Sequence, residues 1–183
     1  MLPMFDIDDF INDCIAARAE TEPRRAIKEV LSRATSRPTD VADALSPERA
    51  EIVRLHSSPE LTVIKVVWAP GMRFHPHDHR MWAAIGIYAG GEDNTFYRRA
   101  EGGLTESGGK ALRAGDVCVL GDDTVHSVAN PTTGYAGAIH VYGGDFFSTA
   151  RSEWDPDSFE ERPYDVEAAL RHFEEANSRA KTA

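Results

Sequence analysis

The sequence predicts a mostly β fold with helical flanks, in which many short strands form a sandwich or a barrel. Residues 61–68 and 83–88 are rich in β-branched and aromatic side chains and are bounded by Pro-Gly and Gly-Gly turns. Apolar residues spaced by three and four, typical of amphipathic helices, occur before about residue 50 and again after Pro163. Short strands with frequent turns are typical of a sandwich or barrel, whose curling and closure protect the strand edges.

The remaining elements follow from apolar spacing and turn residues. Two short amphipathic helices are predicted within residues 1–50, where Pro23 and Pro38 punctuate the pattern. A C-terminal helix is predicted after Pro163, packed on the outside of the β core. The glycine pairs at 102–103 and 108–109 predict turns. Further strands are predicted at residues 94–99, 116–120, 126–129 and 138–142.

Length and composition predict a single domain. The chain has 183 residues, of which 42% are hydrophobic and 27% are charged, as in ordinary globular proteins. Neither an internal repeat nor a low-complexity linker divides it. We expect one domain over residues 1–183, with a helical N-terminal flank at 1–50, a β core at 51–148 and a C-terminal extension with a helix at 149–183.

Charge and cysteine content restrict partners and compartment. Thirty acidic and twenty basic residues give a net charge of −10, which repels phosphate backbones and argues against nucleic-acid binding. Cys14 and Cys118 form no CxxC pair, so a cytoplasmic location is expected. We expect neither secretion nor membrane insertion, because the N-terminus lacks a basic start and no apolar run approaches roughly 18 residues. The pattern is compatible with a monomer or a homodimer.

Three of the seven histidines fall within five residues, at positions 75, 77 and 79. Alternate side chains of a strand share a face, so His77 and His79 can direct two imidazoles into one interior. A closed β core can bring His126 opposite this pair as a third ligand, which leaves positions on a metal open to substrate. Two alternatives stay open: loop histidines beside Pro76 that bind backbone or solvent, and a ligand pair of His75 and His77, which has the same strand parity.

Two segments resemble the paired motifs of the cupin superfamily. Residues 70–79 read PGMRFHPHDH, and residues 115–130 read GDVCVLGDDTVHSVAN. The spacing of glycines and histidines in both segments matches the pattern of that family. The resemblance implies a cupin double-stranded β-helix (jelly-roll) barrel that holds a metal through His77, His79 and His126.

One departure from the commonest cupin pattern narrows the resemblance. Where many cupins have a glutamate ligand after the histidine pair, this sequence has Ala83 and Ala84. An ion bound by three neutral imidazoles keeps its full charge of about +2 and favours anionic ligands such as thiolates and carboxylates. In this respect the chain is similar to the thiol dioxygenases, the cysteine and 3-mercaptopropionate dioxygenase group. The runs HDHRMW at 77–82 and AIHVYG at 138–143 look closest to predicted metal-dependent double-stranded β-helix proteins of unassigned activity.

The same resemblance suggests two catalytic residues. In thiol dioxygenases a Ser-His-Tyr series on the last strand orders the tyrosine hydroxyl near substrate and oxygen. The matching positions here are Ala138, His140 and Tyr142, so the serine is missing. The resemblance implies that His140 orients Tyr142, which donates a hydrogen bond; two interior residues satisfied by hydrogen bonds are the alternative. Because Ala84 stands where some members have a crosslinking cysteine, Tyr142 is expected to be unmodified.

A thiol substrate with a carboxylate also needs a nearby cation, best an arginine, whose planar fork binds a carboxylate through two hydrogen bonds. Arg54 is the leading candidate because its position resembles the arginine or glutamine of the family. Arg80 and Trp82 are further candidates for substrate contact, with packing inside the barrel as the alternative for Trp82. The other arginines considered are Arg73, Arg98 and Arg99.

The resemblance thus implies a mononuclear non-heme Fe(II) dioxygenase that uses O2 to oxidise a small thiol carboxylate to its sulfinate. A first alternative is an isomerase, lyase or hydrolase in which Zn, Mn or Ni acts as a Lewis acid. A noncatalytic cupin that binds a small-molecule ligand is the second, since fold does not fix function.

Overall fold

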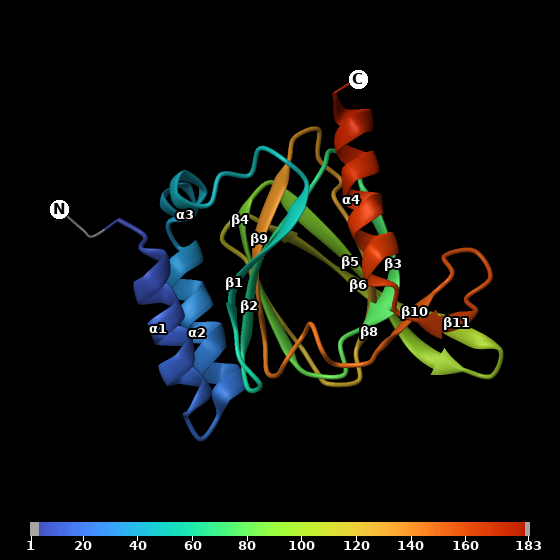
Figure 1. Cartoon of the computed structure of the whole chain (residues 1–183), viewed down its shortest axis with the longest axis horizontal. Coiled ribbons are helices and arrows are strands. Elements are labelled where there is room, and N and C mark those ends of the chain that lie inside the picture. Colours follow the sequence, from blue (N-terminus) through green and yellow to red (C-terminus); the bar gives the residue numbers. More distant parts are fainter. Residues whose placement is uncertain (1–3, 182–183) are drawn as a thin grey trace.

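Two antiparallel β-sheets lie face to face and enclose the larger apolar core (Figure 1). The computed structural model describes residues 4–181. The first sheet contains, in spatial order, β1 (Glu51–Ser57), β2 (Thr62–Trp68), β9 (Ala136–Tyr142), β4 (Ala83–Ala89) and β7 (Val117–Leu120). The second contains β11 (Glu161–Pro163), β10 (Ser152–Trp154), β3 (Arg73–Asp78), β8 (Val125–Ala129), β5 (Gly91–Ala100) and β6 (Gly103–Arg113).

The strand order identifies the architecture. Strands β2 to β9 form two groups of four, in the spatial orders β2-β9-β4-β7 and β3-β8-β5-β6. Eight strands arranged in this way in two sheets form a jelly roll, the architecture of the cupins. The mostly β prediction is therefore confirmed. The predicted closure is wrong: within residues 4–181 no strand ladder joins the two sheets, so the sandwich is not a closed barrel.

Helix α4 (Val166–Ala180) covers the core where the two sheets are not joined. It bridges the two sheets, since the Asn177 side chain donates to the Ala50 carbonyl just before β1 (2.9 Å) and His172 Nε2 donates to the Arg73 carbonyl on β3 (2.6 Å). Its buried Phe173 packs on Trp68, with 5.2 Å between ring centroids. One face of the helix thus packs on the core while most of its other residues are exposed, so it lies on the outside of the β core as the sequence predicts.

Three helices cover the outer face of the first sheet (Figure 1). They are α1 (Ile7–Arg18), α2 (Pro23–Thr35) and α3 (Pro38–Ala44). Ile27 and Leu31 of α2 share a second apolar cluster with Tyr88 on β4 and with Trp82, which immediately precedes β4. The sequence predicts two of these helices. The third begins at Pro38, where the fixed proline φ favours a first helical residue.

The longest strand, β6, is missing from the predicted set because its glycines resemble a turn. The pair at 108–109 lies inside β6, and the turn predicted there is wrong. Gly108 has a φ of +143° and pairs with Phe96 next to a shift in register. A glycine tolerates this conformation, so the pair marks a β-bulge in a strand that continues.

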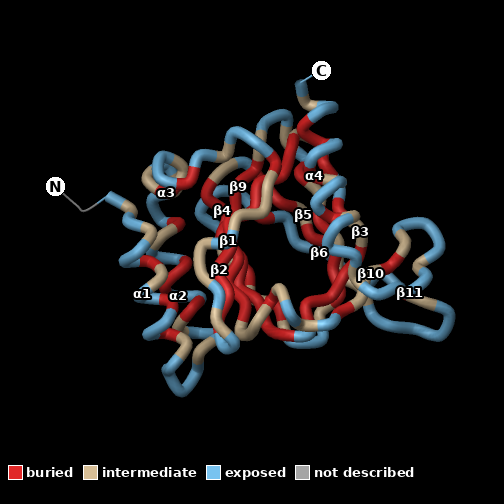
Figure 2. The backbone as a smooth tube through the Cα atoms, in the orientation of Figure 1, coloured by how far each residue is buried: buried red, intermediate tan, exposed pale blue. Residues whose placement is uncertain are grey.

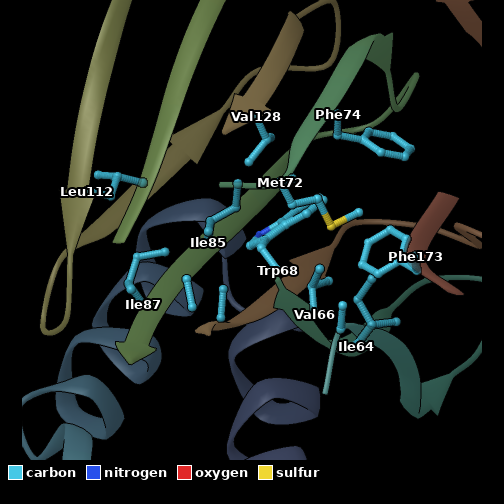
Figure 3. Packing of buried hydrophobic residues seen from close by; sticks show 14 of the residues in the cluster. Ile64, Val66, Trp68, Met72, Phe74, Ile85, Ile87, Leu112, Val128 and Phe173 are labelled. Atoms are coloured by element: carbon cyan, nitrogen blue, oxygen red, sulfur yellow. The ribbon is translucent and has the colours of Figure 1, made fainter. Parts of the chain in front are cut away.

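Burial concentrates on the inner strands of the first sheet. Every residue of β2 and β9 is buried, whereas much of β6 is exposed (Figure 2). Figure 3 shows Trp68, Met72, Phe74 and Phe173 packed together between strands of the two sheets and α4. The inward-facing side chains of β3 and β8 are therefore buried inside the protein, among them His77 and His126. No helix within residues 4–181 has the length and apolar character needed to cross a membrane.

Candidate metal centre

Strands β3 and β8 position the three predicted histidine ligands. His77 and His126 are direct partners in the antiparallel pairing of these strands, which places their side chains next to each other on one face. His79 follows the end of β3 and, as the second residue after His77, joins the same group. The structure therefore brings together three residues that span about 50 positions of the sequence, as the strand alternation predicts.

The three imidazoles converge inside the sandwich. One ring nitrogen from each of His77, His79 and His126 lies within 4.8 Å of the other two. The Nε2 atoms of His79 and His126 are 3.4 Å apart. All three residues are buried. Within the described chain no Asp, Glu or Cys belongs to this group of donor atoms.

Hydrogen bonds fix which nitrogen of two ligands is free. His77 Nδ1 donates to the His75 carbonyl (3.0 Å), and His126 Nδ1 donates to Asn94 Oδ1 (2.7 Å). Each ring therefore carries its proton on Nδ1 and keeps a lone pair on Nε2, which is the tautomer that a metal requires. His79 Nδ1 is buried and has no hydrogen-bond partner among residues 4–181.

Burial keeps these histidines neutral. It lowers the pKa of His126 from 6.5 to about 3, with a further contribution from the charge of His140. Burial, followed by the neighbouring imidazole of His126, also holds the pKa of both His77 and His79 well below 6.5. Neutral rings offer lone pairs at physiological pH, so the set is ready to bind a cation.

The donor set fits a first-row transition metal. Two nitrogens that each lie about 2.1 Å from one ion are about 3.0 to 3.4 Å apart when the angle between them is right-angled to tetrahedral. The 3.4 Å between the Nε2 atoms of His79 and His126 matches the upper end of that range. Without a cation, His79 Nε2 can carry its proton and donate to His126 Nε2, whereas with a cation both nitrogens can offer lone pairs. Three imidazoles suit iron, zinc, copper or nickel.

His75 does not join the group, which answers the alternative that its strand parity left open. The β3 register shifts between Phe74 and His77, and such a bulge breaks the strict alternation of side chains. His75 stacks on Phe74, with ring centroids 4.3 Å apart, and its Nε2 donates to Glu153 (3.1 Å). Its ring is therefore held by Phe74 and Glu153, 6.4 Å from the His77 ring, and it does not belong to the group of donor atoms.

His140 and Tyr142 lie beside the histidine group on β9. The His140 Nδ1 atom and the Tyr142 hydroxyl are 3.0 Å apart, as expected for side chains two residues apart on one strand face. The ring centroids of Tyr142 and His79 are 5.0 Å apart. Burial raises the pKa of Tyr142, so its phenol stays protonated at neutral pH.

The three residues predicted to contact substrate are not brought into this interior. Arg54 is exposed and lies over the Phe147 ring, 3.9 Å from its centroid. Arg80 is bound to the buried Asp78 (2.6 Å) and also points toward Glu161. Trp82 packs in the apolar cluster under the N-terminal helices. For Trp82, packing rather than ligand contact is the role that the structure indicates.

Arg151 is a charged residue near the site that the sequence reasoning missed. It lies in the loop after β9, is 9% exposed, and is held between the rings of Phe146 and Tyr164, each 4.1 Å from its guanidinium carbon. Its Nη1 donates to the Phe146 carbonyl (2.6 Å), whereas its buried Nε has no partner in the described chain. The Phe146 ring on which it lies is 6.2 Å from the His79 ring, which places Arg151 near the histidine group.

A small cavity borders the histidines. Its volume is about 30 Å³, which accommodates about two water molecules. His77, His126, His140 and Tyr142 contribute to one wall. Its other walls include the aromatic rings of Trp68, Phe74, Phe146, Tyr164 and Phe173. A ligand larger than a diatomic molecule or two waters therefore requires movement of these rings.

Solved structures of other proteins resemble part of this chain. No protein-family model matches the chain. A protein of Bacillus halodurans is 14% identical over 57% of this chain and 77% of its own, with a TM-score of 0.51. An RmlC-like cupin with a double-stranded β-helix fold from Methanocaldococcus jannaschii is 10% identical over 56% of this chain and 86% of its own (TM-score 0.47). A variant of Bacillus subtilis oxalate decarboxylase is 19% identical over 50% of this chain and 23% of its own (TM-score 0.41).

These identities are low, so the likeness concerns the fold alone. The strand order already described is that of a jelly roll. The chain has the cupin fold. It combines that fold with a buried three-histidine group that can hold a metal.

Proposed function

We propose that this protein is a mononuclear non-heme Fe(II) enzyme of the thiol dioxygenase kind, which oxidises a small thiol carboxylate to a sulfinate. The observation that carries the proposal is the donor set, which consists of three neutral histidines without a carboxylate. Such a set leaves the charge of a divalent ion intact, so the site attracts anions, among them thiolates.

The surrounding charges favour a ligand with two negative groups. Arg151 is positively charged and buried close to His79. Two buried carboxylates lie near the group: Asp78 is bound by Arg80 and Arg99, whereas Glu92 is 3.6 Å from His140 Nε2. Together with a divalent ion, Arg151 and Glu92 leave two positive charges, which a thiolate and a carboxylate on one small molecule neutralise. Charges buried in this way require compensation.

Two sets of residues then have distinct roles. Arg151 binds the carboxylate through its unpartnered Nε, in place of the exposed Arg54. Tyr142 holds its proton on the hydroxyl beside the reacting sulfur, and His140 orients that hydroxyl. The aromatic walls exclude water from the reaction.

The reaction balances without another reductant. A thiolate and O2 combine to give a sulfinate, so that sulfur is oxidised and both atoms of O2 are reduced and retained in the product. A bound ferrous ion supplies the redox chemistry that this reaction with O2 needs. Cys14 and Cys118 are both free, which agrees with our proposal of a reducing, cytoplasmic location.

An oxygen electrode tests the proposal. The iron-loaded protein is assayed with cysteine, 3-mercaptopropionate, cysteamine and mercaptosuccinate, and we expect oxygen uptake with at least one thiol carboxylate and formation of its sulfinate. Absence of thiol-dependent uptake across the panel would overturn the proposal. Zinc in the purified protein, together with no oxygen chemistry after iron loading, would favour a Lewis-acid isomerase, lyase or hydrolase.

A further inference from the structure

Glu92 is a fully buried carboxylate that the proposed reaction does not use. It lies on β5 and has no exposed surface. Its Oε2 accepts a hydrogen bond from Trp68 Nε1 (2.9 Å), and its Oε1 accepts one from Asn94 Nδ2 (2.9 Å). The nearby His140, together with these two bonds, outweighs the cost of burial and lowers the pKa of Glu92. An ionised carboxylate at this depth can only accept hydrogen bonds.

This restriction determines how Asn94 is oriented. The amide has one donor end and one acceptor end. Because Glu92 accepts only, the Nδ2 end of Asn94 must face it, and the Oδ1 end then faces His126 Nδ1, which is 2.7 Å away. The proton of His126 is therefore placed on Nδ1, and the lone pair on Nε2 faces His79 and the metal position.

The same carboxylate lies beside the second functional pair. His140 Nε2 is 3.6 Å from Glu92 Oε2 and has no hydrogen-bond partner in the described chain. The negative charge favours a proton on this nitrogen, which leaves His140 Nδ1 to accept from the Tyr142 hydroxyl at 3.0 Å. The charge of Glu92 thus acts on His126 through Asn94 and on Tyr142 through His140.

We propose that Glu92 is a positioning residue that fixes the tautomer of His126 through Asn94 and thereby sets the affinity of the three-histidine group for divalent metals. The inference rests on the metal site of the proposed function and is independent of its thiol chemistry. We call the hydrogen-bonded series Glu92–Asn94–His126 the relay. The inference predicts that metal affinity survives when the carboxylate is transferred from position 92 to position 94, but falls when the carboxylate is replaced by an amide.

The variant Glu92→Gln tests the relay. A glutamine has a single oxygen, so it cannot accept from both Trp68 and Asn94. When its oxygen faces Trp68, Asn94 must turn over and offer Nδ2 to His126, whose proton then moves to Nε2. The double variant Glu92→Gln with Asn94→Asp exchanges the two groups. The carboxylate introduced at position 94 accepts from His126 Nδ1, and the glutamine introduced at position 92 donates to that carboxylate while accepting from Trp68.

Two measurements follow the relay. Long-range ¹H–¹⁵N correlation spectra of the metal-free protein report the tautomer of His126, and titration with Co²⁺ alone, followed by visible absorption, reports affinity. We expect an Nδ1–H tautomer in the parent, a clear Nε2–H population in Glu92→Gln with Co²⁺ bound about 10- to 100-fold more weakly, and return of both properties toward the parent in the double variant. Trp68→Phe removes a hydrogen bond to the same carboxylate but leaves the relay, so it should keep the Nδ1–H tautomer.

The outcomes separate the possibilities. An unchanged tautomer and Co²⁺ affinity in Glu92→Gln overturn the inference, as does equal weakening in the single and double variants, which indicates a general structural role. If Glu92→Gln does not fold, the double variant alone decides, because it must show the Nδ1–H tautomer. A parent protein that binds no Co²⁺ contradicts the metal site itself, whereas failed oxygen uptake with intact Co²⁺ binding contradicts the thiol chemistry alone.

Discussion

The Nε2 atoms of His79 and His126 lie 3.4 Å apart in the interior, although 47 positions separate the two residues in the sequence. Because Asn94 binds the Nδ1 proton of His126, the nitrogen that faces His79 carries a lone pair. Burial keeps both rings neutral. The spacing of these two nitrogens fits their binding to one cation, and the first prediction follows from that.

Replacement of a ligand should abolish metal binding while replacement of its neighbour should not. We expect His126→Ala to weaken Co²⁺ or Zn²⁺ binding by more than about 100-fold, because a lost ligand costs more than the 10- to 100-fold typical of its supporting residues. His75→Ala is the matched control, since His75 binds Glu153 and lies outside the group of donor atoms. Metal analysis after dialysis measures both. Equal retention of metal by the two variants would contradict the assigned ligand set.

The neutral histidines should make the metal-free protein sensitive to mild acid. An ordinary histidine has a pKa of 6.5, whereas His126 in the folded protein has a pKa of about 3. As the pH falls, the unfolded chain therefore takes up a proton at this residue before the folded protein does. The stability contributed by neutral burial is complete above about pH 6.5 and is lost progressively down to about pH 3. From about pH 7.5 to 5.5, His126 alone should lower the free energy of unfolding by about 1 kcal/mol.

Urea unfolding of the metal-free protein across this range measures the effect. The window lies above the ordinary pKa of the carboxylates, so their protonation contributes little. His77 and His79 act in the same direction. His126→Gln should show a shallower dependence on pH than the parent. A parent protein whose stability is flat between about pH 7.5 and 5.5 would mean that these rings are not neutral when buried.

The fold and the three ligands follow from local sequence patterns. Alternating apolar residues and turns predict most strands, and the two histidine motifs predict which side chains converge, because the face of a strand residue depends on its position in that strand. The rule that alternate residues of a strand share a face fails where a β-bulge interrupts the strand. This happens between Phe74 and His77 on β3 and at Gly108 on β6.

The surroundings of the ligands depend on contacts that local patterns do not describe. Glu92 stands in a polar run that resembles an exposed turn, yet Trp68 from the opposite sheet covers and binds it. Arg151 follows the last core strand and is buried between Phe146 and Tyr164, the second of which lies farther along the chain. The sequence could have pointed to neither, because both are buried by tertiary contacts.

Arg151 should determine preference for a carboxylate. We expect Arg151→Met to raise the KM for 3-mercaptopropionate about 10- to 100-fold, because a hydrogen bond to a charged group contributes about 1.5 to 3 kcal/mol. The KM for cysteamine, which lacks a carboxylate, should change much less. Arg54→Met is the matched control, since Arg54 is exposed on the Phe147 ring. If Arg54→Met raises this KM more than Arg151→Met does, Arg54 and not Arg151 binds the carboxylate, as the family resemblance implies.

The hydroxyl of Tyr142 should act on turnover and not on metal binding. Tyr142→Phe keeps the ring that stacks on Phe146, with centroids 4.2 Å apart, but removes the group 3.0 Å from His140 Nδ1. We expect kcat per bound iron to fall at least about 10-fold, since a positioned proton donor contributes about 10²- to 10⁴-fold. Tyr88→Phe is the control, because that hydroxyl is also buried but donates to the Leu45 carbonyl on the helix side of the sheet (2.8 Å). Equal activity of the two variants would show that the Tyr142 hydroxyl only satisfies His140, whereas a selective loss in Tyr142→Phe with parental iron content would place the phenol beside the reacting sulfur.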